Sequence, residues 1–409
     1  MSRTACLRPF GAGPHSPNPL SPSLPPGRRE RGGLRQSSPC FFFRLTPPSS
    51  PGGRGGGWEK RAGVMRAPAA RPTFRARITL RIGSERLIRS LFFCFLLSVP
   101  ALAAAAPLAW VSNELAGTVT VIDTATDRVV ATVSLGSRPR GIEVSADGKR
   151  VYVALSDLDH NVKGPGDAIV ALDAASRKVV ARFDAGSNPE RFALSRDGSR
   201  LYASNEDAGT ATVTDVKRQK VVAALVVGIE PEGVALSPDG RWVYVTAETS
   251  NTVSVIDTKA NKVVASFLVD PRPRAAAFSP DGRRAWVTAE IGGTVSVIDA
   301  TRHQVLKSIP IPGSHPVGVV VSPDGRRVYV ANGHGNAVAV LDALTGKLLA
   351  NVPVGRRPWG IAVTADGKKV YTANGVSNDV SVLDAVTLKV VATIPAGQGA
   401  WGVAIGRSR

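Results

Sequence analysis

Hydrophobic and polar residues alternate in short runs along residues 107–409, and these runs predict β-strands. In the run NTVSVID, Val253 and Val255 fall on one face of a strand, and Thr252 and Ser254 fall on the other. The run KVVASFLV predicts a further β-branched strand, and GVALSPDGRWVYV predicts two strands joined by a tight Asp-Gly turn. No helical periodicity interrupts this pattern, which therefore favours an all-β domain.

The same pattern returns at an almost constant interval, which indicates an internal repeat. A strand-ending aspartate recurs at spacings of 50, 42, 42, 42, 43 and 42 residues, at Asp123, Asp173, Asp215, Asp257, Asp299, Asp342 and Asp384. An aromatic column consists of Trp110, Tyr152, Tyr202, Tyr244, Trp286, Tyr329 and Tyr371. An Asp-Gly turn occurs six times, beginning at Asp147, Asp197, Asp239, Asp281, Asp324 and Asp366.

A period near 42 residues with short strands is typical of a propeller blade of four antiparallel strands, named A to D here from the axis outward. Seven aspartates with six Asp-Gly turns predict a seven-bladed β-propeller. The repeat region begins at a strand B, AWVSN, and ends at a strand A, WGVAI. We therefore expect the first three strands and the last strand to share one blade, closing the ring across the termini.

The repeated phrase VYVTAETSNTVSVIDTKANKVVASFLV resembles the YVTN-type β-propeller repeat of exported bacterial and surface-layer proteins over about residues 107–405. The phrases ERFALSRDGSRLYASNEDAGTATVTD and RAAAFSPDGRRAWVTAEIGGTVSVIDA resemble a seven-repeat subfamily associated with pyrroloquinoline quinone (PQQ)-dependent alcohol catabolism. This resemblance implies a periplasmic setting and no particular reaction. The larger propeller and Trp-containing repeat motifs of alcohol-oxidising quinoproteins are missing from the sequence, so we expect no cofactor.

The residues before the repeats differ in character from the propeller region. Residues 1–64 are rich in Pro, Gly, Arg and Ser, which predicts a disordered extension or a start site assigned too early, the true start being Met65. Residues 65–106 are expected to contain a signal peptide, with arginines, an apolar run at 91–99 and a cleavage site near Ala103–Ala105. The apolar run is short for a membrane span, although an uncleaved anchor is the alternative. We expect an exported, periplasmic protein with no membrane span in its mature form.

Charge and cysteine content narrow the function further. Residues 1–100 hold 17 Lys and Arg against 3 Asp and Glu, so most of the formal charge of +19 lies in the leader. The high charge is therefore no argument for nucleic-acid binding by the propeller, and no nucleic-acid partner is expected. Cys6, Cys40 and Cys94 all precede the expected cleavage region, which leaves the mature chain without a disulfide or a thiolate metal ligand.

A site has to lie where the repeats differ. In an antiparallel blade, the A–B and C–D turns share one face, and the B–C and D–A loops share the other. The first face is monotonous in sequence, whereas the D–A loops vary and end beside the axis. We predict a ligand or partner site at this axial mouth. Its candidate residues are Arg138, Arg140, Glu190, Arg191, Glu230, Glu232, Arg272, Arg274, His315, Arg357, Trp359 and Trp401.

The charges of these loops favour an anionic ligand. Seven arginines, the six above and Arg356, face only three glutamates on the D–A loops. The B–C loops are expected further out and are more acidic and amide-rich, with Glu114, Asn205, Glu206, Asp207, Glu248, Glu290, Asn332 and Asn374. A basic mouth inside an acidic rim suits a small anion or an acidic patch on a periplasmic protein. A solvated loop surface whose charges serve only solubility is the alternative.

Two weaker constellations remain. Asp157, Asp159, Asn161 and Asp167 in the second-repeat insertion offer closely spaced oxygen ligands, but the Gly and Glu of a calcium-binding EF-hand loop are missing. We expect an ordinary surface insertion and no metal. His315 and His334 could share the variable face as a pair.

Three classes of function fit the sequence. An exported, non-catalytic binding or accessory protein is favoured, because no nucleophile and base can be recognised. A lactonase-like or lyase-like enzyme would need His315 or His334 to meet Glu230, Glu232 or Glu290. A cell-surface structural or adhesion module would need self-assembly or wall attachment. Fold analogy cannot choose among them.

Overall fold

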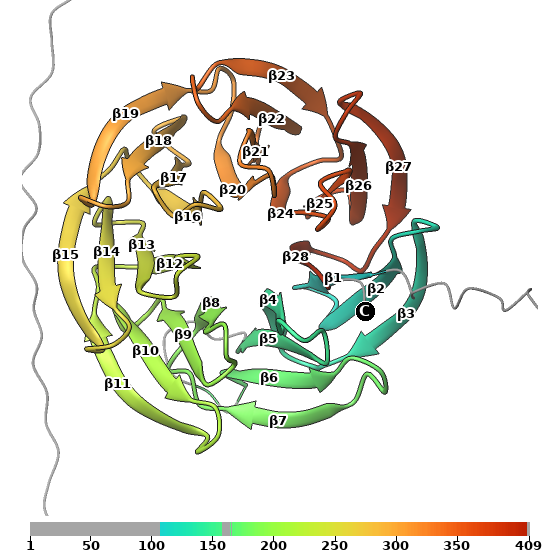
Figure 1. The fold of residues 1–409 in the computed structure, drawn as a ribbon. Helices are drawn as coiled ribbons and strands as arrows, with labels where there is room; N and C mark the ends of the chain where they lie inside the picture. The colour runs from blue at the N-terminus through green and yellow to red at the C-terminus, as the bar shows by residue number, and fades with distance from the viewer. Residues whose placement is uncertain (1–106, 158–163, 165, 407–409) are drawn as a thin grey trace, which may run out of the picture. The chain divides into compact units, whose positions relative to one another are not determined.

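The computed structural model describes residues 107–157, 164 and 166–406, and these form seven four-stranded antiparallel sheets arranged around a central axis (Figure 1). The predicted all-β, seven-bladed propeller is therefore confirmed. Within the described residues, no helix is long and apolar enough to cross a membrane. The disordered extension, the signal peptide and its cleavage site lie outside the described residues and stay predictions.

The strands form four concentric sets. The innermost are β4 (Arg138–Val144), β8 (Pro189–Leu194), β12 (Pro231–Leu236), β16 (Pro273–Phe278), β20 (Pro316–Val321), β24 (Pro358–Val363) and β28 (Ala400–Ile405). The second are β1 (Leu108–Asn113), β5 (Arg150–Ser156), β9 (Arg200–Asn205), β13 (Trp242–Ala247), β17 (Arg284–Ala289), β21 (Arg327–Asn332) and β25 (Lys369–Asn374). The third are β2 (Thr118–Asp123), β6 (Ala168–Asp173), β10 (Thr210–Asp215), β14 (Thr252–Asp257), β18 (Thr294–Asp299), β22 (Ala337–Asp342) and β26 (Asp379–Asp384). The outermost are β3 (Arg128–Ser134), β7 (Val179–Phe183), β11 (Lys220–Val226), β15 (Lys262–Leu268), β19 (Gln304–Pro310), β23 (Leu348–Pro353) and β27 (Lys389–Pro395).

The last strand completes the first blade. β28 pairs with β1 in the antiparallel sheet β28-β1-β2-β3, with Trp110 opposite Ala404 and Val111 opposite Val403. The edge of β1 that faces the axis is therefore hydrogen-bonded by the C-terminal strand.

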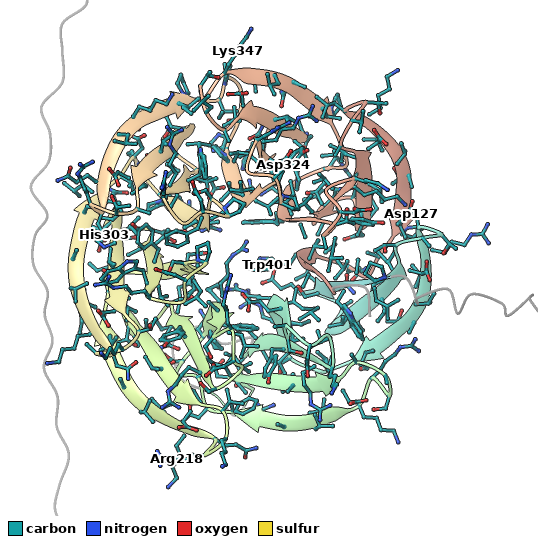
Figure 2. All side chains as sticks on the ribbon, viewed as in Figure 1. Asp127, Arg218, His303, Asp324, Lys347 and Trp401 are labelled. Carbon is teal, nitrogen blue, oxygen red and sulfur yellow. The ribbon has the colours of Figure 1, made fainter. Side chains whose placement is uncertain are left out.

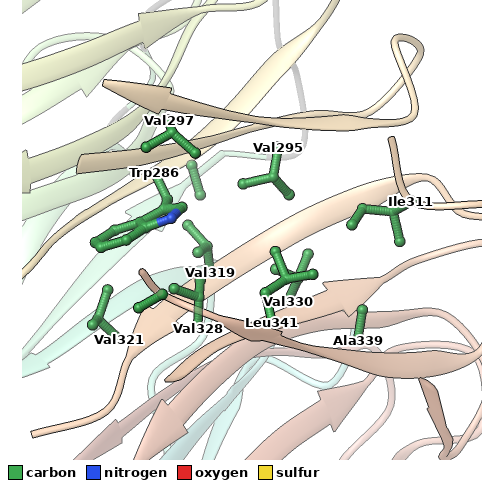
Figure 3. Packing of buried hydrophobic residues seen from close by; sticks show 12 residues of the cluster. Trp286, Val295, Val297, Ile311, Val319, Val321, Val328, Val330, Ala339 and Leu341 are labelled. Atoms are coloured by element: carbon green, nitrogen blue, oxygen red, sulfur yellow. The ribbon is translucent and has the colours of Figure 1, made fainter. Parts of the chain in front are cut away.

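The aromatic column packs between blades, as predicted. All seven aromatic side chains are buried. Trp286 on β17 belongs to the same buried cluster as Val319, Val321 and Val328 of the next blade (Figure 3). Each blade thus buries one face against its neighbour, and the core is a ring of interfaces.

The aspartate and Asp-Gly columns are structural, as their repetition implied. Asp299 accepts a hydrogen bond from the Thr301 amide at 2.9 Å, and its contacts with Thr301 hold the pKa of the carboxyl at about 2 despite the opposing effect of burial. Gly240 and the five equivalent glycines have positive φ angles, which the turn between strands A and B requires.

The innermost strands approach one another too closely for most side chains. A Cβ atom on Gly360 of β24 would press on the Trp401 carbonyl of β28 and lie 2.8 Å from the Gly402 Cα atom. The position of Gly360 lies two residues after the first proline of its strand, and β28 has Ala400 in place of that proline. The equivalent position is Gly in five innermost strands, β24 included, and Ala275 in a sixth. Arg191 of β8 is the exception.

Candidate functional site

The B–C and D–A loops meet on one face, as predicted, and we refer to their ends around the axis as the mouth. A backbone hydrogen bond joins the two loops of a blade. Glu248 N donates to Glu230 O at 2.8 Å, Glu290 N to Arg272 O at 2.8 Å, and Gly375 N to Arg357 O at 2.9 Å. The bond recurs in six blades and holds each B–C loop directly against the D–A loop.

Each innermost strand places one side chain at the entrance to the axis, directly after the column of prolines and Ala400. These residues are Arg140, Glu190, Glu232, Arg274, Val317, Trp359 and Trp401, and all but Trp359 are buried. Four charged groups from four consecutive blades therefore stand beside two aromatic rings.

The first ion-pair network surrounds Arg140. Its Nε atom lies 3.0 Å from Glu114 Oε1, and its guanidinium also contacts Glu190 and lies 3.5 Å from Glu206 Oε2. Arg138 binds the same Glu114 carboxylate. Although burial opposes the shift, Arg140 and Arg138 lower the pKa of Glu114 below its usual value, so this carboxylate is ionised at neutral pH.

The second network surrounds Arg274. Its guanidinium lies 2.8 Å from Glu232 Oε1, contacts Glu248, and places Nε 3.4 Å from Glu290 Oε2. Two further arginines join it. Arg272 lies 2.8 Å from Glu248, and Arg357 donates to Glu290 Oε1 at 2.9 Å.

These contacts correct the predicted separation of a basic mouth from an acidic rim. The expected outer carboxylates of Glu114, Glu248 and Glu290 reach the arginines and neutralise them. The side chains of Asn205, Asn332 and Asn374 are also not on a rim; all three residues end second-set strands and are buried. An excess of arginines over D–A loop glutamates therefore does not mean a surplus of available positive charge.

Glu232 is the carboxyl most changed by its surroundings at the mouth. Burial raises its pKa to about 7; Arg274 opposes this shift, and the carboxylates of Glu206 and Glu248 add to it. Around neutral pH this group can therefore gain or lose a proton in the mouth.

Arg191 differs from the paired arginines. Its guanidinium carbon lies 4.5 Å from the centre of a Trp401 ring, two blades away, so the side chain reaches across the mouth. Its buried Nε atom has no hydrogen-bond partner among the described residues, and no ion pair of its guanidinium is formed there. Burial lowers the pKa of Arg191 to about 10, Glu232 opposes the shift and Arg274 adds to it. The group remains charged at neutral pH.

Two tryptophans form the opposite wall. Trp359 and Trp401 lie nearly parallel, with ring centres 6.4 Å apart, and Trp401 lies at the centre of the ring of blades (Figure 2). The guanidinium carbons of Arg274 and Arg357 lie 5.2 and 4.5 Å from the Trp359 ring. Cations stacked on aromatic faces thus surround the axis.

The remaining predicted residues lie at the edge of the mouth. Glu230 accepts a hydrogen bond from the Thr249 hydroxyl and lines cavities of about 370 and 500 Å³ between neighbouring loops. His315 lies against His334, with ring centres 4.3 Å apart, which confirms that the two histidines share this face.

One unusual group lies further along the axis and was not predicted. Glu143 on β4 occupies a column that holds Ala or Val in the six other innermost strands. Its Oε2 accepts a hydrogen bond from Leu194 N at 3.0 Å, and burial raises the pKa of its carboxyl to about 7. The lone glutamate in an alanine column was a visible signal.

The described carboxylates of the second-repeat insertion accept hydrogen bonds from backbone amides of the insertion and of the following D–A loop. Asp167 accepts hydrogen bonds from the amides of Asp157 at 2.9 Å and Asn188 at 3.1 Å, and Asp157 accepts one from Gly166 N at 2.8 Å. Asp159 and Asn161 lie outside the described residues.

Comparisons with known proteins support the propeller class. Residues 284–403 match the family described as Cytochrome D1 heme domain, and residues 101–271 match the family described as Choice-of-anchor I domain. No curated protein matches the sequence. Each family match covers less than half of the chain, so the class established here is the seven-bladed β-propeller.

Solved structures show the same fold. The hydrazine synthase of Kuenenia stuttgartiensis is 25% identical, with a TM-score of 0.60 over 65% of this chain and 89% of its own. A functionally unknown protein from Desulfotomaculum acetoxidans DSM 771 is 19% identical, with a TM-score of 0.64 over 74% of this chain and 100% of its own. A protein of Bacteroides fragilis NCTC 9343, provisionally assigned as a 6-phosphogluconolactonase, is 17% identical, with a TM-score of 0.62 over 74% of this chain and 99% of its own.

The axis does not fit the haem that the first family match suggests. Arg191 reaches across to Trp401 at 4.5 Å, and Arg274 reaches Trp359 at 5.2 Å, so side chains cross the space that a macrocycle would need. The closely packed innermost strands cannot widen without breaking contacts such as that between Gly360 and Trp401.

Proposed function

We propose that this propeller is an exported, non-catalytic binding protein whose mouth takes a small anionic ligand, with the Arg191 guanidinium as the group that meets the anion. Export follows from the basic, apolar and small-residue order of residues 81–106. The resemblance to the PQQ-associated subfamily suggests a role in periplasmic alcohol catabolism.

The observation that carries the proposal is the place of Arg191. The six other innermost strands have Gly or Ala at the position that Arg191 occupies on β8. Its guanidinium is charged, has a buried Nε atom without a hydrogen-bond partner, and forms no ion pair among the described residues. A charge held in this way lowers stability, and such a cost is typical of functional sites. A carboxylate that pairs with Arg191 would remove the cost.

The surroundings of Arg191 define the chemistry of the ligand. A guanidinium binds a carboxylate or phosphate through paired hydrogen bonds, each worth about 1.5–3 kcal/mol. The paired tryptophans already stack against guanidinium groups, and the neutralised arginines around them give little attraction to a large acidic protein surface. These features favour a small carboxylate over an acidic protein partner. PQQ, a flat carboxylate-rich compound, is one candidate by resemblance.

A thermal-shift screen tests the proposal. The purified exported chain would be melted with PQQ, citrate and inorganic phosphate at low and at raised salt concentration. We expect at least one anion to raise Tm, with a smaller rise at high salt, and no rise in Arg191→Ala. A shift that is the same in the parent and in this variant would place the anion elsewhere, and no shift with any probe would contradict the proposed ligand class.

A lactonase-like enzyme is the second candidate, because the structure brings Glu290 together with His315 and His334. The likeness to the B. fragilis protein shows the fold alone. Hydrolysis of a lactone panel by the parent, lost in His334→Gln, would favour the enzyme over the binding protein.

A further inference from the structure

Three nitrogen- and oxygen-bearing side chains converge at one edge of the mouth. Potential ligand atoms of Glu290, His315 and His334 all lie within 4.8 Å of one another. Glu290 follows β17, His315 precedes β20, and His334 lies between β21 and β22, so two neighbouring blades supply the group. We propose that these three residues bind a divalent transition-metal ion, a site separate from the Arg191 anion site.

The donor set favours a transition metal over calcium or magnesium. Two imidazoles and one carboxylate are ligands that suit Zn²⁺ and similar ions, whereas Ca²⁺ and Mg²⁺ prefer oxygen atoms alone. Three protein ligands also leave coordination positions for water or for an added ligand.

The backbone holds the three ligands in place. His315 O accepts a hydrogen bond from Gly333 N at 2.8 Å, which fixes the two histidine loops together. Glu290 N donates to Arg272 O at 2.8 Å, so the carboxylate residue is anchored by the equivalent bond of the next blade. A site assembled by these bonds needs only side-chain adjustment to close around an ion.

Both imidazoles are available as ligands. Their ring centres lie 4.3 Å apart at an interplanar angle of 37°, and neither ring forms a hydrogen bond among the described residues. The contrast is His303, whose Nδ1 is already 2.8 Å from the Tyr244 hydroxyl.

Arg357 opposes the metal. It donates to Glu290 Oε1 at 2.9 Å and places a positive charge beside the site. Replacing it with Gln removes this charge, so the affinity for a divalent ion should rise. Arg272 and Arg274 also lie 3.4 Å from Glu290 Oε2, so the two imidazoles are the ligands that no arginine occupies. The other candidate cluster, Glu190 with Glu206 and Glu232, is a poorer metal site, because it has no imidazole and Arg140 and Arg274 pair with all three of its carboxylates.

Titration of the metal-free purified protein with Zn²⁺ by calorimetry tests the site. We expect one tightly bound ion per chain. The affinity should fall at least tenfold in His334→Gln and in His315→Gln, since mutating even a residue that only hydrogen-bonds to a metal ligand lowers metal affinity by about that factor. His334 is an exposed loop side chain, so its variant should fold like the parent. His303→Gln is the matched control, because it removes an imidazole outside the site.

Four results decide the matter. Arg357→Gln should bind Zn²⁺ more tightly than the parent, and Arg191→Ala should bind it equally, which separates this site from the proposed anion site. The visible spectrum of the Co²⁺-loaded protein should show imidazole coordination that is lost in His334→Gln. Absence of Zn²⁺ binding to the parent, or equal binding by the His315, His334 and His303 variants, would overturn the proposal.

Discussion

Replacing the half-buried Arg191 with Ala should stabilise the protein in the absence of ligand, although removing a packed side chain usually destabilises a protein. Burial lowers the pKa of Arg191 from its usual 12.5 to about 10. Each pKa unit corresponds to about 1.4 kcal/mol, so a pKa difference of about 2.5 means that keeping Arg191 charged lowers the stability of the folded state by about 3 kcal/mol. Because both pKa values exceed 7, the cost is fully present at neutral pH and is relieved only as the pH rises above about 10.

Two losses offset part of this gain. The guanidinium carbon lies 4.5 Å from the Trp401 ring, a contact worth about 0.5–2 kcal/mol. The half-buried side chain also loses the surface that it buries, whereas the backbone fits Ala, since Ala275 occupies the equivalent position on β16. We therefore expect the free energy of unfolding to rise by about 1–2 kcal/mol.

Urea denaturation at pH 7, followed by tryptophan fluorescence, measures the change. The control is Arg140→Ala, one blade away. Because Arg140 neutralises Glu114 and Glu190, its loss leaves buried carboxylates unpaired and should destabilise the protein by about 3–5 kcal/mol. If Arg191→Ala lowers stability by more than about 1 kcal/mol, a change beyond the usual effect of a surface substitution, the guanidinium is structural and the functional argument fails.

Three further predictions concern the ring itself. Burial raises the pKa of Glu143 from 4.5 to about 7, so the parent should lose stability as the pH rises from about 5 to 7. In Glu143→Gln the Leu194 amide keeps an acceptor, and up to about 3 kcal/mol of this pH-dependent loss should disappear. If the free energy of unfolding from urea denaturation changes with pH as much in the variant as in the parent, the burial effect is contradicted. Gly360→Ala should lower stability by about 1–3 kcal/mol, because its Cβ meets the β28 backbone, and an unchanged Tm would show that the innermost strands can separate. Deleting residues 399–409 removes β28 from its pairing with β1 and should lower Tm by many degrees in differential scanning calorimetry; a deletion variant as stable as the parent would refute the role of this pairing.

The fold could be predicted because its determinants recur. The strand-ending aspartates cap turns through short contacts within one repeat, as Asp299 does with Thr301, and such local contacts leave a fixed spacing in the sequence. The aromatic column is equally readable, since Trp286 and its equivalents bury the same face in every blade.

The charge of the mouth could not be predicted in the same way. Loop position identified Arg138 and Arg274, but not the glutamates from neighbouring loops that fold back onto them. Such pairing depends on side-chain reach across blades, which spacing does not encode. Arg191 and Glu143 were detectable, since each breaks a column of small residues when the innermost strands are aligned.

The most direct test of anion binding at Arg191 is calorimetric titration of the parent and of Arg191→Ala with citrate and with PQQ, at two salt concentrations. At least one of these anions should bind the parent once per chain, and more weakly at high salt. Arg191→Ala should fold cooperatively but bind the anion at least tenfold more weakly, a loss of about 1.4 kcal/mol or more of binding free energy. Equal affinity in the two proteins would show that the anion does not meet Arg191 and would contradict the proposed function.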